Sequence, residues 1–143
     1  MSNINVRQMV AEAKRQIENL SPVEVVVELA TNQVLLLDIR EAGELLQTGV
    51  IPGAVAAPRG LLEFYADASS IYHWEAFDPQ RRLILYCASG DRSALAAAVL
   101  QQIGFTNVAH LDGGLEAWQT AGQPVAPALK GLKRSLPAAS ASR

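Results

Sequence analysis

The residue of this sequence best suited to nucleophilic chemistry is Cys87, the only cysteine among 143 residues. It ends a mostly apolar run that begins at Leu83, and such a run predicts a buried strand. The residues from Ser93 onward are rich in Ala and Leu, which predicts a helix. The thiol therefore lies where a helix dipole and the unpaired N–H groups of a tight loop favour negative charge. Because the thiolate is the reactive form of cysteine, this position favours nucleophilic attack by Cys87.

The loop that begins at the cysteine, Cys-Ala-Ser-Gly-Asp-Arg, places four residues between Cys87 and Arg92. We expect the backbone N–H groups of Ala88 to Arg92 to point toward the sulfur, and Gly90 to permit the backbone conformation that this requires. Ser89 either adds a hydroxyl donor or faces solvent. Arg92 adds a permanent positive charge. The competing interpretation is an unreactive buried cysteine at the end of a strand, which is the commoner fate of this residue type.

The sequence predicts four strands, residues 33–39, 54–57, 83–87 and 108–111. The other candidate residues lie at or after the ends of the three strands that do not contain Cys87. Because these strands alternate with helices, the sequence predicts an α/β fold with a mainly parallel sheet. Right-handed crossovers place the C-terminal ends of such strands at one edge of the sheet, where ligands bind. That edge should collect the cysteine loop, the turn Asp112-Gly113-Gly114, and the charged side chains of Asp38, Arg40 and Arg59.

The charged residues at this edge allow more than one role. Arg92 either supports an anionic sulfur or forms an ion pair with Asp38 that fixes the base of the loop. Arg59 either receives an anionic substrate at the rim or is a solvated surface residue. Arg40 is expected to be structural.

The histidines and tryptophans are the remaining candidates. The polar connection 67–78 contains His73 and Trp74, which could line the mouth of the pocket as part of a lid. His110, near the end of a strand, is expected to be structural, and Trp118 is expected to pack in the core. Because the two histidines lie far apart in the sequence, a zinc site has little support.

Composition indicates one folded domain. Half of the residues are hydrophobic and 18% are charged, and 143 residues suffice for one sizeable core. A lone cysteine excludes an intramolecular disulfide and a cysteine-rich metal site, and it suits a reducing compartment. No stretch resembles a signal peptide or a membrane span, so we expect a cytoplasmic protein that does not bind a membrane.

Charge and periodicity divide the chain into three parts. Residues 1–129 carry a net charge of −6, which argues against a nucleic-acid partner, whereas the last fourteen residues contribute +4.

Residues 4–20 have the apolar spacing of an amphipathic helix, expected to pack on its own domain or to pair with another copy in a homodimer. We expect this N-terminal helix over 1–19, the main domain over 20–125 and a flexible basic tail over 126–143. Ser21 to Glu24 form a capping box that predicts the next helix start.

Several motifs together resemble those of single-domain rhodaneses, which are thiosulfate or persulfide sulfurtransferases. The motifs are Asp38-Ile39-Arg40-Glu41, Ile51-Pro52-Gly53-Ala54, the six-residue cysteine loop with Ser93, Gly104-Phe105, and Asp112-Gly113-Gly114 with Trp118. The resemblance covers residues 20–125 and implies a three-layer α/β/α fold with a parallel sheet of four to five strands, the fifth lying around Asn19-Leu20. It also implies that Cys87 carries a persulfide and passes its sulfur to a thiol acceptor, without a metal or an organic cofactor.

Two features keep alternatives open. Cysteine phosphatases of similar architecture have five residues between Cys and Arg, so the shorter loop here argues against a phosphatase or an arsenate reductase. Asp91 stands where many catalytic rhodaneses carry a basic or neutral residue, and its carboxylate opposes binding of thiosulfate. The second alternative is a non-enzymatic module that uses this fold to bind a partner, although such modules usually lack the cysteine.

Overall fold

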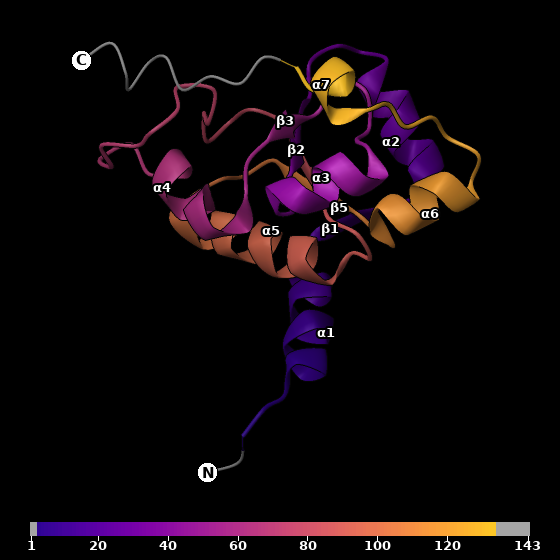
Figure 1. Ribbon diagram of the computed structural model, residues 1–143. Coiled ribbons are helices and arrows are strands. Elements are labelled where there is room, and N and C mark those ends of the chain that lie inside the picture. The colour runs from indigo at the N-terminus through magenta and orange to yellow at the C-terminus, as the bar shows by residue number, and fades with distance from the viewer. Residues whose placement is uncertain (1–2, 134–143) are drawn as a thin grey trace.

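A five-stranded parallel sheet forms the centre of the computed structural model, which describes residues 3–133 (Figure 1). Its spatial order is β1-β5-β4-β2-β3, and every neighbouring pair is parallel. The strands are β1 Glu18–Leu20, β2 Leu35–Asp38, β3 Val55–Ala56, β4 Leu83–Tyr86 and β5 Val108–Leu111. The predicted α/β fold is confirmed, including the edge strand expected around Asn19-Leu20.

Helices cover both faces of the sheet, which gives three layers (Figure 1). The helices are α1 Val6–Gln16, α2 Pro22–Leu29, α3 Ala42–Thr48, α4 Leu62–Ala66, α5 Asp91–Ile103, α6 Gly114–Thr120 and α7 Ala128–Gly131. Helices α1, α4 and α5 lie on one face, and α2 and α6 pack on the other. Within residues 3–133, no helix is long and apolar enough to cross a bilayer.

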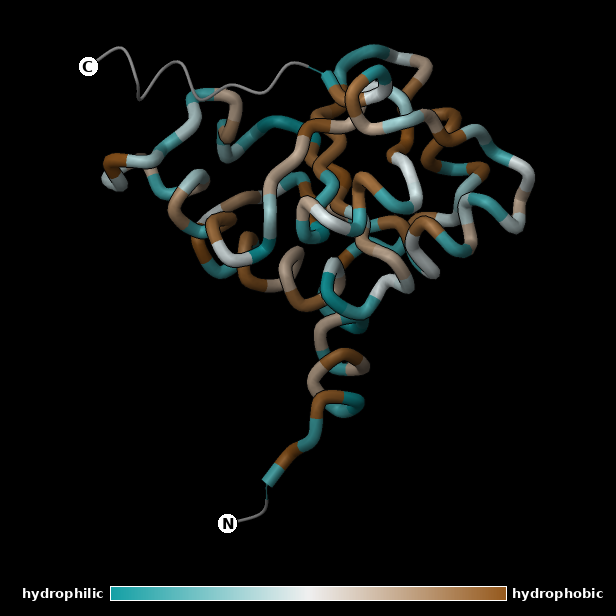
Figure 2. The backbone as a smooth tube through the Cα atoms, viewed as in Figure 1, coloured by the Kyte–Doolittle hydropathy of each residue, from teal (hydrophilic) through white to brown (hydrophobic). Residues whose placement is uncertain are grey.

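The central strands are apolar on both faces because both faces are covered. Side chains alternate along each strand, so Leu83 and Leu85 pack toward α5 while Ile84 packs toward α6. The hydropathy colouring shows the same pattern, with hydrophobic residues concentrated in the centre of the molecule (Figure 2). This core fixes the ends of β2, β4 and β5, from which the candidate site residues follow.

The N-terminal helix is shorter than the expected range of 4–20. It begins after Asn5, whose side chain forms a capping box with Gln8, and it ends at Gln16. The Asn19 side chain donates to the carbonyl oxygens of Lys14 and Ile17 at 2.9 and 3.2 Å, which satisfies acceptors at the helix end. Glu18–Leu20 then leaves the helix and pairs with β5. Pairing of two copies through this helix stays a prediction.

The segment after residue 125 is more ordered than expected of a flexible tail. Val50 and Ala126 form an antiparallel bridge, the Gly53 N–H donates to the Gly131 carbonyl at 2.8 Å, and the Lys133 N–H donates to the Ala54 carbonyl at 2.8 Å. Residues 126–133 are thus held by backbone hydrogen bonds against the turn before β3, which composition does not reveal. The rest of the predicted tail, residues 134–143, lies outside the described residues.

Packing of α1 against α5 can be tested with two isoleucines near the N-terminus. Ile17 is 8% exposed and belongs to the core cluster that contains Ala97 and Leu100, whereas Ile4 is 65% exposed. Ile17→Ala should lower the free energy of unfolding by about 3 kcal/mol because it leaves a cavity. Ile4→Ala, the matched control, should change it by no more than about 0.5 kcal/mol. Urea denaturation measures both, and equal effects would contradict the packing described.

Candidate active site

The Cys87 thiol lies directly beyond β4, beneath the start of α5. Its side chain is 0% exposed. Its sulfur Sγ accepts hydrogen bonds from the N–H groups of Gly90 at 3.2 Å and Ser93 at 3.4 Å, and the Ser93 hydroxyl oxygen lies 3.6 Å away. The sulfur therefore faces the N–H groups at the positive end of a 13-residue helix, as the sequence predicts.

The loop supplies fewer donors to the sulfur than expected. Of the predicted amides from Ala88 to Arg92, that of Gly90 contacts Sγ, and the second contact comes from Ser93, one residue beyond the loop. Gly90 has a φ of 101°, a left-handed conformation in which a side chain would be strained. Ser89 is exposed, so its solvent-facing alternative describes this structure.

A second glycine-containing turn packs backbone against backbone on the cysteine loop. The N–H of Leu115 donates to the carbonyl of Cys87 at 2.8 Å, and that of Glu116 donates to the carbonyl of Ala88 at 3.0 Å. A Cβ atom on Gly114 would lie 2.6 Å from these two carbonyl oxygens. The start of α6 therefore holds the loop at a distance that only glycine allows, and the turn meets the loop as predicted.

The two arginines at the site are both ion paired. Arg92 binds the carboxylate of Glu44 through two hydrogen bonds of 2.8 and 2.9 Å, whereas Asp38 binds Arg40 at 2.7 and 3.0 Å. The expected alternative of an Arg92–Asp38 pair is therefore wrong. Hydrogen bonds from Arg92 lower the pKa of Glu44 to about 2. Bonding to Glu44 raises the pKa of Arg92, and the nearby Cys87 adds to this effect.

Arg40 and Arg59 occupy different places from the sulfur. Arg40 is buried and also donates to the Thr48 hydroxyl and the Gly49 carbonyl, so it joins β2 to the end of α3. Arg59 pairs with Glu63 at 2.7 Å and lines a groove with residues of α1 and α5. The structure thus places Arg40 in a structural position and does not bring Arg59 to the cysteine loop.

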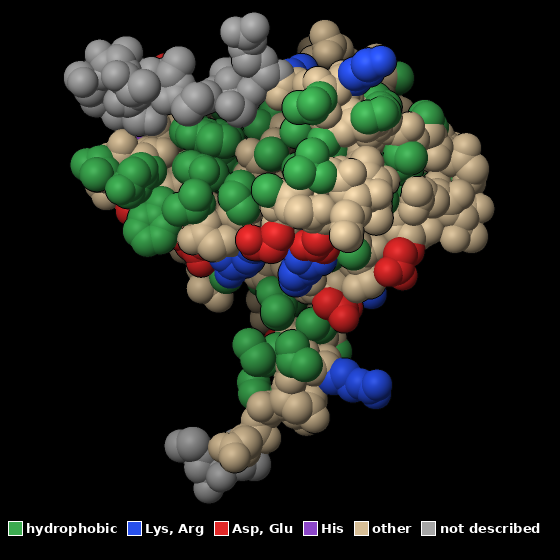
Figure 3. All heavy atoms as spheres, in the orientation of Figure 1, with side chains coloured by type: hydrophobic (Ala, Val, Ile, Leu, Met, Phe, Trp, Pro, Cys, Tyr) green, Lys and Arg blue, Asp and Glu red, His purple; other side chains and the backbone are tan. Residues whose placement is uncertain are grey.

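A pocket of about 260 Å³ lies beside the loop, between α3 and α6. Cys87 does not line it; the pocket reaches Ala88, the next residue, and its wall carries two carboxylates, Glu44 and Glu116. Asp91 and Glu41 stand exposed at the starts of α5 and α3. Acidic side chains lie across this face of the molecule, interspersed with Lys and Arg side chains (Figure 3). Besides the Glu44–Arg92 ion pair, the rim of the site therefore carries the carboxylates of Glu116 and Asp91, although its interior favours an anion.

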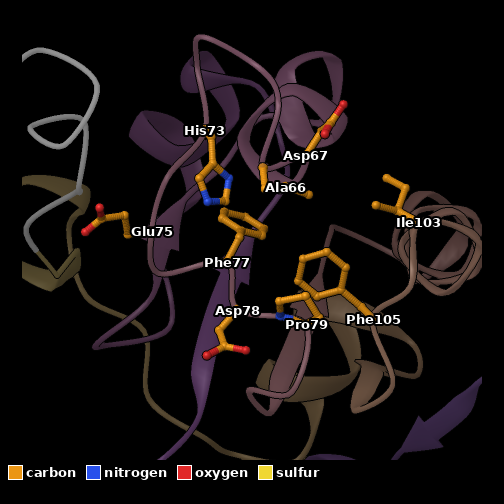
Figure 4. A pocket seen from close by; sticks show the side chains of 10 residues that line it. Ala66, Asp67, His73, Glu75, Phe77, Asp78, Pro79, Ile103 and Phe105 are labelled. Atoms are coloured by element: carbon orange, nitrogen blue, oxygen red, sulfur yellow. The ribbon is translucent and has the colours of Figure 1, made fainter. Parts of the chain in front are cut away.

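The connection 67–78 does not cover this site. Trp74 is buried and stacks on Tyr65, with ring centroids 3.9 Å apart. His73 Nδ1 donates a hydrogen bond to the Tyr65 carbonyl at 2.9 Å, and the ring lines a different pocket, of about 500 Å³, with Phe77 and Ile103 (Figure 4). Since Ile103 ends α5 and the cysteine lies at its start, the expected lid role is wrong.

The sequence analysis did not predict that three polar side chains near the sulfur contact one another. The Ser93 hydroxyl lies 2.8 Å from His110 Nδ1, and His110 Nε2 lies 2.8 Å from Asn19 Oδ1. Both ring nitrogens of His110 are thus bonded, which fits its expected structural role, but the chain of contacts begins at Cys87. Within residues 3–133, no group of three His, Cys, Asp or Glu side chains is arranged to hold a metal ion.

Comparison with known proteins identifies the class to which this fold and site belong. Residues 21–121 match the family described as Rhodanese-like domain. The chain is 37% identical over 95 residues to a sulfurtransferase from Allochromatium vinosum, a match that covers 66% of this chain and 80% of that one. This chain belongs to the rhodanese-like domain family, and its sulfurtransferase-named relative supports a rhodanese-type transferase.

Two solved structures have the same fold. One, from Rhodopseudomonas palustris, is described as a protein of unknown function and a possible tyrosine phosphatase; it has a TM-score of 0.82, 36% identity and coverage of 88% of this chain and 97% of that chain. The other is the polysulfide-sulfur transferase homodimer from Wolinella succinogenes, with a TM-score of 0.69, 27% identity and coverage of 84% and 85%. Both support the rhodanese fold.

The contact between the two glycine-containing loops predicts a difference between two alanine substitutions. Gly114 and Gly122 both have positive φ angles, but nothing lies within 4 Å of a Cβ on Gly122. Gly122→Ala should cost about 1 kcal/mol of unfolding free energy through backbone strain alone. Gly114→Ala should cost about 3 kcal/mol or more, because the Cys87 and Ala88 backbone must also move. Equal shifts in urea denaturation would contradict this account of the loop contact.

Proposed function

We propose that this protein moves a sulfane sulfur from a persulfide or thiosulfate donor to a thiol acceptor through a persulfide on Cys87. The observation that carries the proposal is the position of the Cys87 sulfur, buried at the N-terminus of α5 with two N–H donors aimed at it. Hydrogen bonds to an ionised sulfur are stronger than those to a neutral one, so these donors favour the thiolate.

The reaction has two steps. In the first, the thiolate of Cys87 attacks the outer sulfur of the donor; a sulfur–sulfur bond forms at Cys87, and the donor's own sulfur bond breaks, releasing sulfite from thiosulfate or a thiolate from a persulfide. In the second, the acceptor thiolate attacks the outer sulfur of the Cys87 persulfide and leaves Cys87 as a thiolate. Such a covalent intermediate gives ping-pong kinetics. Because the working group is one free thiol, we place the protein in the reducing cytoplasm.

The acidic rim favours a persulfide over thiosulfate as donor. Thiosulfate carries two negative charges, and the rim presents the carboxylates of Asp91 and Glu116, whereas the charges of Arg92 and Glu44, like those of Arg40 and Asp38, offset each other in ion pairs. A persulfide or polysulfide can present less charge to the same rim. The similarity to a protein named as a polysulfide-sulfur transferase supports this class of donor.

A cysteine phosphatase is the second candidate, because one similar structure is described as a possible tyrosine phosphatase. The loop from Cys87 to Arg92 is one residue shorter than in phosphatases, and both terminal nitrogens of Arg92 bind Glu44. An arginine held in this way has fewer donors for a phosphate. The persulfide reaction therefore suits the site better.

Intact mass after incubation with a sulfur donor tests the proposal. Wild-type protein should gain the mass of one sulfur atom from thiosulfate or from a low-molecular-weight persulfide, and a thiol should remove it, because the thiolate is the nucleophile. Cys87→Ser should gain none. If neither donor adds sulfur, the proposal fails and the non-enzymatic binding module gains support. Turnover of p-nitrophenyl phosphate that depends on Cys87 would instead favour the phosphatase.

The acidic rim predicts the effect of one charge reversal on thiosulfate turnover. Asp91→Lys should lower the KM for thiosulfate about fivefold and leave kcat nearly unchanged, because it replaces repulsion of the dianion by attraction. The effect should shrink at high salt. Glu75→Lys makes the same charge change at the exposed edge of the pocket that contains His73, and its KM should match that of the wild type. An unchanged KM in Asp91→Lys, or an equal fall in the control, would contradict the role of the rim.

A further inference from the structure

A continuous chain of hydrogen bonds leads from the Cys87 sulfur to the end of α1. The Ser93 hydroxyl lies 3.6 Å from Sγ and 2.8 Å from His110 Nδ1, and His110 Nε2 lies 2.8 Å from Asn19 Oδ1. Asn19 Nδ2 reaches two carbonyl oxygens of the α1 end, those of Lys14 and Ile17. Ser93 and His110 are both fully buried. The chain joins the consecutive elements α5 and β5 to β1, which is distant from both in sequence.

The contacts of this chain fix which atom donates and which accepts in each hydrogen bond. Carbonyl oxygens only accept, so Asn19 must present Nδ2 to them and Oδ1 to His110. Nε2 of His110 therefore carries a hydrogen, and Nδ1 of the neutral ring is an acceptor. The Ser93 hydroxyl can donate to Nδ1 at 2.8 Å or to the Gly90 carbonyl at 3.2 Å, and the shorter contact is the one that satisfies the buried ring nitrogen. Ser93 Oγ is then free to accept the S–H of Cys87.

Burial keeps the His110 ring neutral while the thiol is neutral. Burial lowers the pKa of His110 to about 4, and Lys14 on α1 adds to this effect, whereas Asp112 and Asp91 oppose it. An anion formed inside the site would change this balance, since a nearby negative charge favours an imidazolium. The sulfur of Cys87 is the group next to Ser93 that can become such an anion.

We propose that Ser93 and His110 form a proton relay for Cys87. When the thiol ionises, the S–H bond breaks and its proton passes to Ser93 Oγ, while the original hydroxyl proton of Ser93 forms the N–H bond at His110 Nδ1. The products are a thiolate and an imidazolium, and no other reactant is needed. The new hydroxyl proton of Ser93 points to the thiolate, which then accepts three hydrogen bonds, and Asn19 stabilises the imidazolium through Nε2–H.

This relay rests on the proposed function, because it assigns the proton that Cys87 must lose before attack. It also explains how a fully buried sulfur can ionise, since the pair stays neutral overall and no isolated charge is left in the interior. His110 and Asn19 act through Ser93, so they are positioning residues. The proton returns along the same path when the thiol is regenerated.

The rate of Cys87 alkylation by iodoacetamide, measured against pH, tests the relay without any sulfur donor. Ser93→Ala and His110→Gln should each shift the profile to higher pH by about one unit, a roughly tenfold loss of rate at neutral pH. The double variant should show the same shift as either single variant, because both changes break one relay. Ser93→Thr keeps the hydroxyl and should stay within about twofold of the wild type. His73→Gln, which changes the histidine remote from the sulfur, should leave the profile unchanged.

Additive shifts in the double variant, or a Ser93→Ala profile equal to that of the wild type, would overturn the proposal. A ring ¹⁵N NMR measurement on otherwise unaltered protein serves if these variants fail to fold. Since His73 and His110 are the two histidines, a His73→Gln background isolates the signal of His110. The imidazolium signature should accompany the ultraviolet absorbance of the thiolate, and both should be lost in Cys87→Ser. A ring that keeps a single proton, on Nε2, at every pH at which the thiolate absorbs would also overturn the relay.

The outcomes separate the two proposals. If the Ser93 and His110 variants shift the alkylation profile as expected but no donor adds sulfur to the wild type, the relay stands and the proposed sulfurtransferase activity fails. A persulfide mass gain without the shift would do the reverse.

Discussion

A sulfur that must be able to ionise while fully buried is the constraint that the proposed function places on this structure. An unpaired charge taken out of water is costly, so every group around Cys87 must supply a donor or a compensating charge. The start of α5 supplies two N–H groups, and the turn before α6 fixes the loop by donating to its carbonyls. The described residues leave no buried side-chain nitrogen or oxygen without a hydrogen-bond partner. Packing and chemistry thus impose the same geometry.

The parts of the site that follow from local pattern could be predicted from the sequence. An apolar run, a glycine-containing loop and an Ala- and Leu-rich helix place Cys87 with few alternatives, and the edge rule for parallel sheets brings Asp112-Gly113-Gly114 to it. These inferences need only the spacing of apolar residues in strands and helices and the right-handedness of the connections between parallel strands. They succeed because each concerns backbone placement, which short stretches of sequence largely decide.

Pairings between side chains of distant elements could not be predicted in this way. The sequence analysis offered Arg92 two roles, support of the sulfur or a pair with Asp38. Its partner is instead Glu44, a residue 48 positions away on α3, because Asp38 is already bound by Arg40, two residues along the chain. Asn19 and His110 are 91 residues apart and meet only because β1 pairs with β5 in a register that sets Asn19 opposite His110. A serine, a histidine and an asparagine at such separations leave no local signal. Their contact depends on strand register and helix docking, which are properties of the whole fold.

The site therefore acts on anions at two distances with opposite signs. Close to the sulfur, N–H groups favour negative charge through direct hydrogen bonds, which act over about 3 Å and are little screened inside the protein. At the rim, the carboxylates of Asp91 on α5 and Glu116 on α6 repel anions through a solvent-screened field. Under the proposed function, this arrangement favours a sulfur donor that carries little charge during its approach. This separation explains how one fold can keep the same nucleophile and change its donor, since the inner donors are backbone groups fixed by the fold, whereas the rim charges are surface side chains that substitution can alter freely.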